Sequence, residues 1–299
     1  MIFEYAVSPA LFSSEERLLF LMEAFGIGQG RLVSDFPRRD WEKMARGFID
    51  SCAKDPTQRH VWIEVLIAIR KYALHERQGP TWDDHLDWLS NALDEHTRPG
   101  RAFRAILAER GDARSESVLP LAVGLAKQEL WTCPASRNVP RIASDMVRET
   151  APLLNVSTSL ILVDRHFNPR NESFVKVLVE FSRIVLTKTA QPKITQIKFV
   201  TAYDVDVPPM TIQAFAQNCV DVLPSSIPKG ISVKFVLKAK ALLHDRFVLT
   251  ERGCIQFGQG LDEGKGHVQL NRLSEVDHRR ELANWDQQAV HTFIVEGQK

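Results

Sequence analysis

The hydrophobic period of this 299-residue chain changes near Ser157, and no other feature of the sequence restricts the possible folds as strongly. Before it, apolar side chains recur at helical spacing, as in the series Val61, Val65 and Ile69. After it, short apolar runs alternate with helix-like segments, an order typical of an α/β sheet. The chain is long enough for two domains at roughly 150 residues each. We therefore predict an all-α module at 1–115, a linker and the start of a connecting helix at 116–145, and an α/β sandwich with a mixed sheet at 146–299.

In the first half we expect a helix that begins after Ser13 or Ser14 and ends at Gly26. Further helices are expected at 39–53, 57–76, 81–96 and 101–109, the third with Thr81 as its N-cap. The glycine spacing of residues 26–30 resembles that of a phosphate-binding loop. However, this stretch follows a helix and lacks the Gly-Lys-Ser/Thr ending, so we do not assign it to a nucleotide. The polar stretches 111–117 and 133–140 are linker candidates, and a helix is expected at 139–154.

In the second half, strands are expected at 160–163, 194–202, 231–237, 244–250 and 254–257, with helices around 174–185 and 210–222. Along the third strand, Lys234 and Lys238 alternate with apolar residues, which predicts that they point outward. Together with Lys240 they would form a basic surface for a polyanion. A solvated sheet edge is the alternative explanation.

Composition excludes several classes of protein. With 38 basic and 37 acidic residues, the net charge of +1 exerts no long-range attraction on nucleic acid or membrane. No apolar run approaches the roughly 18 residues that span a bilayer, and the first residues lack a signal-peptide pattern. The four cysteines are scattered without metal-ligand spacing. We expect a cytoplasmic protein with no transmembrane segment, no metal and no cofactor.

Residues 242–264, LLHDRFVLTERGCIQFGQGLDEG, contain the spacing most suited to chemistry. His244 and Arg246 are two apart on an expected strand, so their side chains would leave the same face. Glu251 follows at the hairpin tip, and Gly258 and Gly260 would let a ligand approach the backbone. An imidazole beside a guanidinium can hold a phosphate. A surface ion pair and an ordinary turn are the alternative interpretation.

The same residues resemble the phospholipase D superfamily, whose signature is H-x-K-x4-D-x6-G-S-x-N. The frame fits without a gap at these positions: His244, Arg246, Glu251, Gly258, Gln259 and Leu261. Only the His and the first Gly are kept. In active members, the resemblance implies, the His is a nucleophile that forms a phosphohistidine, and the Lys and Asn bind phosphate. Arg is not equivalent to Lys where an in-line phosphoryl geometry is needed, so the motif is degenerate.

Within that superfamily, the HDR triplet and the G-x-GLD tail are similar to the C-terminal phospholipase D-like domain of MIT-domain proteins associated with the ESCRT machinery. The stretch around Asp164 and Pro169 extends the similarity, which covers about residues 140–299. It implies binding of anionic lipid and self-association rather than hydrolysis. Residues 1–115 do not resemble the three-helix MIT module, so the ESCRT partnership is not carried over. The resemblance also implies a setting in bacterial antiphage and conflict systems.

The prediction that follows is a protein that binds a phosphate-rich ligand, either nucleic acid or anionic lipid. His244 and Arg246 would grip the phosphate, Glu251 would orient one of them, and the glycines with Gln259 would give backbone access. Because strands end near the ligand crevice, Asp164, Arg165 and His166 would flank the same pocket, although His166 could equally be a hydrogen-bonded loop histidine. We expect a homodimer that recognises a protein partner through residues 1–115.

Two other functions stay open. One is a metal-independent phosphodiesterase or nuclease in which His244 attacks phosphorus and the second subunit's copy protonates the leaving group. The other is a non-catalytic scaffold that recognises a protein through its helical module.

Overall fold

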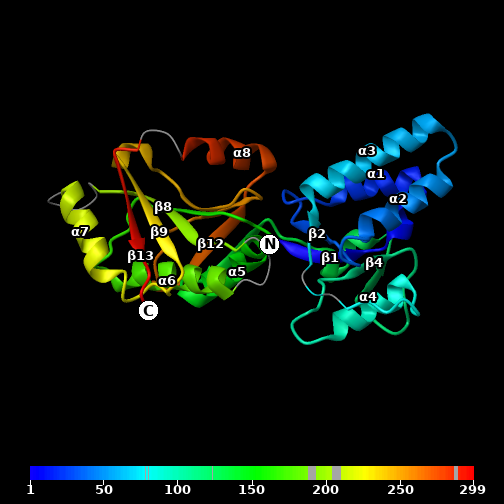
Figure 1. The fold of residues 1–299 in the computed structure, drawn as a ribbon, viewed down its shortest axis with the longest axis horizontal. Helices are drawn as coiled ribbons and strands as arrows, with labels where there is room; N and C mark the ends of the chain where they lie inside the picture. Colours follow the sequence, from blue (N-terminus) through cyan, green and yellow to red (C-terminus); the bar gives the residue numbers. More distant parts are fainter. Residues whose placement is uncertain (78, 80, 123, 188–192, 204–209, 286–288) are drawn as a thin grey trace. The chain divides into compact units, whose positions relative to one another are not determined.

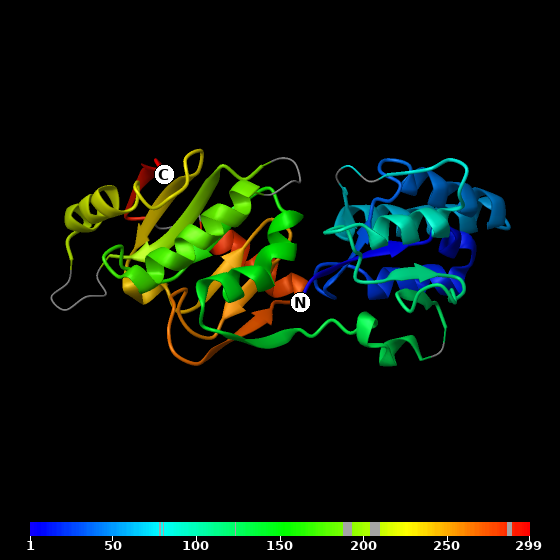
Figure 2. The same cartoon turned by 90° about the horizontal axis from the view of Figure 1, so that it is seen from below.

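The computed structural model describes residues 1–77, 79, 81–122, 124–187, 193–203, 210–285 and 289–299. The chain divides into two compact units: Ile2–Pro134, and Ala135–Lys299 together with Met1. Each unit is an α/β structure with its own sheet (Figures 1 and 2). No helix in the described ranges is long and apolar enough to cross a membrane.

The N-terminal unit is built on a five-stranded parallel sheet in the order β3-β2-β1-β4-β5. The strands are β1 (Phe3–Val7), β2 (Arg31–Ser34), β3 (Leu74–His75), β4 (Ile106–Ala108) and β5 (Val118–Pro120). Four helices accompany them: α1 (Glu15–Ala24), α2 (Trp41–Cys52), α3 (Pro56–Tyr72) and α4 (Trp88–Thr97). Alternate residues of β1 divide between two cores. Tyr5 and Val7 pack with α1, α2 and α3, whereas Ala6 packs with α4. Helices therefore cover both faces of the sheet.

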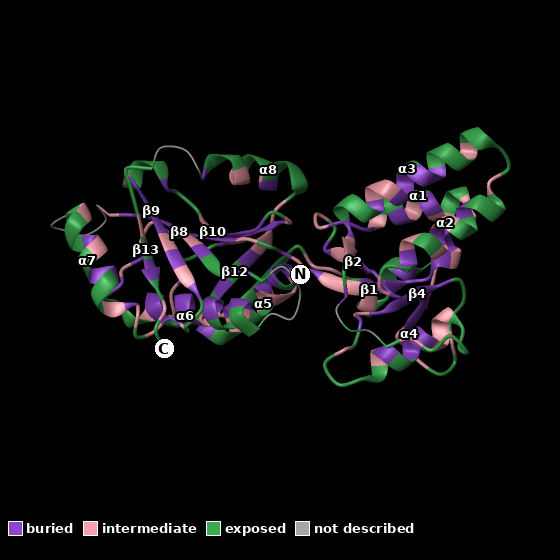
Figure 3. Cartoon of the chain, in the orientation of Figure 1, coloured by how far each residue is buried: buried purple, intermediate pink, exposed green. Residues whose placement is uncertain are grey.

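The prediction of an all-α N-terminal module is wrong. Its strands are two to five residues long, and most of their side chains are buried (Figure 3). Strands covered on both faces lose the apolar–polar alternation that would reveal them. The expected helix at 101–109 contains β4 instead. The segment 116–145, predicted as a linker and the start of a helix, contains β5, a further strand β6 (Ser136–Pro140) and the first residues of α5.

The longer helices were predictable. The ranges 39–53 and 57–76 are confirmed as α2 and α3, with small differences at their ends. The range 81–96 is confirmed only in its second half, because α4 begins at Trp88. Its N-cap is Asp87, whose side chain accepts a hydrogen bond from the Ser90 amide at 2.7 Å. Thr81, the predicted cap, belongs to the preceding loop.

The glycine-rich stretch 26–30 lies between α1 and the start of β2. Gly26 and Gly30 have φ angles of 140° and 75°, which L side chains rarely adopt. Their amides and carbonyls bond within the turn and to the start of β1. This loop is at the amino edge of the parallel sheet, whereas ligands of such sheets bind at the carboxyl edge.

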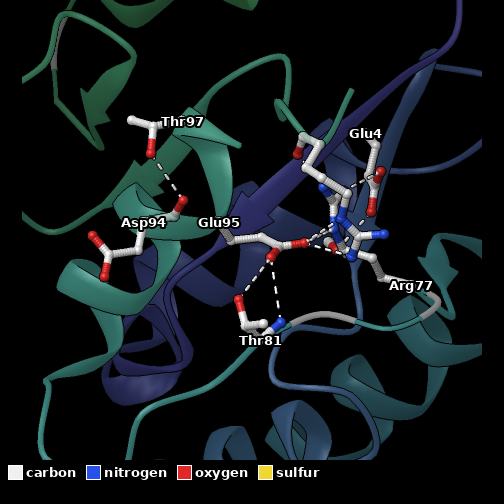
Figure 4. Close-up of polar contacts among 8 residues, drawn as sticks. Glu4, Arg77, Thr81, Asp94, Glu95 and Thr97 are labelled. Atoms are coloured by element: carbon white, nitrogen blue, oxygen red, sulfur yellow. Dashed lines mark hydrogen bonds and ion pairs between the residues drawn. The ribbon is translucent and has the colours of Figure 1, made fainter. Parts of the chain in front are cut away.

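A buried ion network joins β1, the segment after β3, and α4 (Figure 4). Arg77, 6% exposed, donates to Glu95 at 3.0 Å and to Glu4 at 2.7 Å. Glu95, 1% exposed, also accepts from Arg101 at 2.7 Å and from the amide and hydroxyl of Thr81 at 3.3 Å. Every charge in this network is compensated inside the protein.

The C-terminal unit has an eight-stranded mixed sheet in the order β13-β9-β8-β7-β10-β11-β12-β6. Besides β6, its strands are β7 (Leu160–Val163), β8 (Gln196–Ala202), β9 (Ser232–Lys238), β10 (Arg246–Leu249), β11 (Cys254–Phe257), β12 (His267–Arg272) and β13 (His291–Glu296). Its helices are α5 (Ala143–Asn155), α6 (Glu172–Thr187), α7 (Ile212–Val222) and α8 (Glu275–Asn284). Strands β7, β8 and β9 run parallel, and the other pairs are antiparallel. In Figure 1, α5 and α6 lie on the opposite side of this sheet from α8.

The predicted alternation of strands and helices between 160 and 257 is confirmed, and the mixed sheet with it. The sequence interpretation missed β6, β12, α8 and β13. Residues 133–140 were expected to be a linker, but β6 pairs with β12 there. Because β6 is an edge strand with three exposed residues, its composition is polar like that of a loop. The helix predicted at 139–154 accordingly begins only at Ala143.

Candidate anion-binding site

The carboxyl end of β7 lies beside the start of β10, since the two strands are antiparallel and Val163 pairs with Phe247. Val163 and Phe247 pack in a core with Trp285. Side chains alternate along a strand, so Arg246, one step before Phe247 and paired with Phe257, leaves on the opposite face of the sheet. Asp164 directly follows β7 and is close enough for the charge of Arg246 to act on it. The sheet therefore brings a carboxylate and a guanidinium from distant parts of the chain to one edge.

Asp164 organises the loops at this edge. Its side chain is fully buried. One oxygen accepts from the His166 amide at 2.8 Å, and the other accepts from the Leu261 amide at 2.6 Å. Burial raises the pKa of Asp164, and the two backbone hydrogen bonds and the charge of Arg246 oppose that rise. The carboxylate thus ties the loop after β7 to the loop after β11.

His166 lies near three cations and one carboxylate, Asp262, whose charge acts against theirs. Burial lowers the pKa of this imidazole below its ordinary value of 6.5. The charges of three neighbours act in the same direction: Arg165, Arg246 and Lys240. Arg165 Nε donates to His166 Nε2 at 2.8 Å, so the neutral ring carries its proton on Nδ1. An anion in this position would interact favourably with all three cations.

Arg246 is partly buried, and not all of its N–H donors have hydrogen-bond partners in the described residues. One Nη donates to the backbone oxygen of His244 at a long 3.4 Å. Its Nε is shielded from solvent and has no hydrogen-bond partner in the described part of the chain. An unsatisfied buried donor costs about 1–3 kcal/mol, which an incoming acceptor would recover.

The glycines of the loop after β11 allow close packing within the protein. A Cβ on Gly260 would lie 2.3 Å from an oxygen of Asp262 and 3.3 Å from one of Asp164. Asp262 itself pairs with Arg141 at 2.5 Å. A Cβ on Gly258 would lie 3.4 Å from the Gln269 carbonyl, to which the Gly258 amide donates. Gly260 therefore lets the loop close over the two carboxylates, while Gln259 is exposed.

His244 does not share a hollow with Arg246, contrary to the prediction. It is exposed and lines a hollow of about 280 Å³ with Lys238 and Trp285, and Arg246 does not line that hollow. The reason is that β10 begins only at Arg246, so His244 precedes the paired strand and does not follow its alternation. The structure thus brings Arg246 together with Asp164, Arg165 and His166, and leaves His244 outside that group.

The predicted basic surface is also corrected. Lys238 is buried, because β9 runs between β8 and β13 and is covered on both faces. Its Nζ donates to the Asn284 carbonyl at 3.1 Å and lies 5.3 Å from the Trp285 ring centre. Lys234 is half-buried on the same strand. Lys240 is exposed, and its charge reaches His166.

Glu251 is not part of the site. Its carboxylate accepts from the Thr158 amide at 2.6 Å and from the amide and hydroxyl of Ser159 at 3.0 and 2.8 Å. These residues precede β7, whereas Asp164 follows it. Glu251 thus lies in the turn beyond Leu249, and Leu249 alone is roughly 10 Å from Arg246 along β10 at about 3.3 Å per residue.

Sequence reasoning missed Arg141 and the role of Asp262. Asp262 stood in the quoted G-x-GLD tail, which could have drawn attention to it. Arg141 lies between β6 and α5, in a stretch with no local signal. Among the described residues, no group of three His, Cys, Asp or Glu side chains is placed to hold a metal ion.

Comparison with protein-family models and with curated proteins finds no match to this chain.

Proposed function

We propose that the C-terminal unit binds a phosphate-bearing ligand at the cluster formed by Arg165, His166, Lys240 and Arg246. The observation that carries the proposal is that the buried Nε of Arg246 has no hydrogen-bond partner in the described part of the chain, while Arg165 contacts the His166 ring at 2.8 Å. Guanidinium groups present forked donors that match phosphate oxygens, and a lysine adds a point charge.

The charge balance at this edge supports an anionic ligand. Three cations, Arg141, Arg165 and Arg246, are accompanied by two carboxylates, Asp164 and Asp262. Asp262 is already paired with Arg141. Asp164 is buried and accepts backbone hydrogen bonds. Arg165 bonds only to the His166 ring and the Leu243 carbonyl and has no carboxylate partner within the described residues.

The resemblance to the phospholipase D superfamily extends this proposal. It favours binding over hydrolysis because the motif is degenerate, and His244 and Arg246 do not line one cavity. The same resemblance suggests a homodimer within a prokaryotic antiphage or conflict system, and we keep the cytoplasmic location predicted from the sequence. In that setting the N-terminal unit would recognise a protein partner.

The proposal is tested by fluorescence anisotropy with labelled single-stranded DNA and RNA, and by sedimentation with phosphatidylserine vesicles beside neutral vesicles. Arg246→Ala should weaken binding of the true ligand about tenfold or more, the usual loss for a charged hydrogen-bonded contact. The matched control is Arg279→Ala, an exposed arginine on α8 whose ion pair within the described residues is with Glu275 of the same helix. Affinity for all these probes that is the same in both variants would contradict the proposal.

Hydrolysis is examined with the same nucleic acids and a chromogenic phosphodiester in EDTA. Binding without turnover supports the proposed function. Turnover that disappears in His244→Ala would instead identify the protein as a phosphodiesterase that uses the hollow lined by His244.

A further inference from the structure

The carboxyl edge of the N-terminal sheet contains a hollow of about 640 Å³ between the loop after β2 and the described residues Gly79, Trp82 and Asp84. Its walls include three apolar side chains, Pro37, Met44 and Trp82, and two cations, Arg38 and Lys43. Asp40 and Asp84 complete the rim. Hollows of this size and mixed lining are typical of small-molecule sites.

Its place in the topology is where ligands of parallel sheets bind, outside the carboxyl ends of the strands. The strand order reverses between β1 and β4, which is the usual position of the crevice. Here that position is filled by the protein itself. Trp41 is fully buried, donates to the Val7 carbonyl at 2.6 Å, and packs edge-on against Phe12 at 5.4 Å. Space for a ligand lies instead beside β2 and β3.

The aromatic wall is held in position. The Trp82 Nε1 donates to Asp84 at 2.9 Å, and its ring packs edge-on against Phe36 at 5.6 Å. Trp82 is only half-buried, so part of the ring remains available to the hollow. A planar base can stack on such a ring, with Met44 and Pro37 as further apolar contacts.

The charged residues of the hollow are suited to the phosphate and ribose groups of a nucleotide. Lys43 is exposed on the first turn of α2 and makes no ion pair within the described residues. Arg38 faces the same hollow while bonded to Glu76 at 2.8 Å. These cations suit phosphate, and the carboxylates of Asp40 and Asp84 suit ribose hydroxyl groups.

We infer that this hollow binds a nucleoside phosphate, with the base on Trp82 and the phosphate on Lys43 and Arg38. This site is separate from the phosphate cluster of the C-terminal unit and does not depend on it. It would give the N-terminal unit a small-molecule ligand of its own.

Isothermal titration of the full-length protein with ADP, adenosine and inorganic phosphate tests the inference. Trp82→Ala should weaken ADP binding about tenfold or more through lost base stacking. Because Trp82 also packs on Phe36, its replacement could affect folding, so a second variant at an exposed residue tests the same site. Lys43→Glu changes an exposed side chain and should weaken ADP binding about fivefold or more. Lys54→Glu, another exposed lysine of this unit, is the matched control and should leave it unchanged.

Arg246→Ala separates this site from the C-terminal cluster and should retain the ADP binding. If ADP binding is lost in Arg246→Ala and kept in Trp82→Ala and Lys43→Glu, the nucleotide occupies the C-terminal cluster, and the inference fails while the proposed function stands. Absence of ADP binding up to about 1 mM, a free energy near −4 kcal/mol, overturns the inference. Inorganic phosphate that binds as tightly as ADP overturns it as well.

Discussion

Each of the two units contains a cluster of charged side chains, but the two clusters are compensated differently. In the N-terminal unit, Arg77 and Glu95 are almost fully buried, and each finds its partners within the protein. In the C-terminal unit, the charges of Arg165 and Arg246 act on a neutral His166, and neither arginine forms an ion pair within the described residues. We call the first network closed, because its charges are paired within the protein and stabilise the fold. We call the second open, because its unpaired arginines can still bind an anionic ligand. The number of charged residues alone would not distinguish a closed network from an open one.

The largest expected effect comes from opening the closed network. Arg77→Met should lower the free energy of unfolding by about 3–5 kcal/mol, because Glu95 would lose a buried partner. Urea denaturation followed by circular dichroism measures this loss. Arg59→Ala, which breaks an exposed pair with Asp50, should cost less than about 1 kcal/mol. A similar loss in both variants would mean that the buried network has no special role.

A smaller effect is expected at the loop that closes over the carboxylates. Gly260→Ala should destabilise the protein by about 1 kcal/mol, since the Asp262 carboxylate would have to turn away from the new Cβ and loosen its pair with Arg141. Binding of the phosphate ligand should weaken in parallel. The control is Gly47→Ala in α2, where a Cβ meets no neighbouring atom. That change should stabilise by about 0.5–1 kcal/mol through helix propensity. Thermal unfolding that is unaffected by Gly260→Ala would count against the close packing.

The open network should respond to pH through His166. Its pKa is lowered in the free protein, so the ring is neutral near pH 7. A bound phosphate favours the protonated ring and raises this pKa. Affinity should therefore increase as the pH falls below the ordinary value of 6.5 and level off once the free protein is protonated as well. Anisotropy titrations across this range measure the slope. His166→Gln should flatten it, and an unchanged slope in that variant would assign the titration to another group.

The smallest effect is expected at Glu251. Because its carboxylate bonds to the amides of Thr158 and Ser159, Glu251→Gln should lower stability by less than about 1 kcal/mol and leave ligand affinity unchanged. A tenfold loss of affinity in this variant, with stability preserved, would restore Glu251 to the site that the motif predicted.

The sequence by itself determined the elements whose signals are local. Helical spacing of apolar residues was sufficient for α2 and α3, and the switch to short apolar runs was sufficient for β7, β8, β9 and β11. It also identified Asp164, Arg165 and His166 as candidates, because they follow an apolar run where a strand must stop, and Arg246, because of its spacing from His244.

Only the tertiary structure decided which of these residues meet. The bond from Asp164 to Leu261 joins positions 97 residues apart, and no local pattern encodes it. Strands β1 to β5 have no alternation because helices cover both faces of their sheet, so their sequences resemble short helical or loop segments. His244 and Arg246 separated because alternation holds only within a paired strand, and pairing is a property of the assembled sheet.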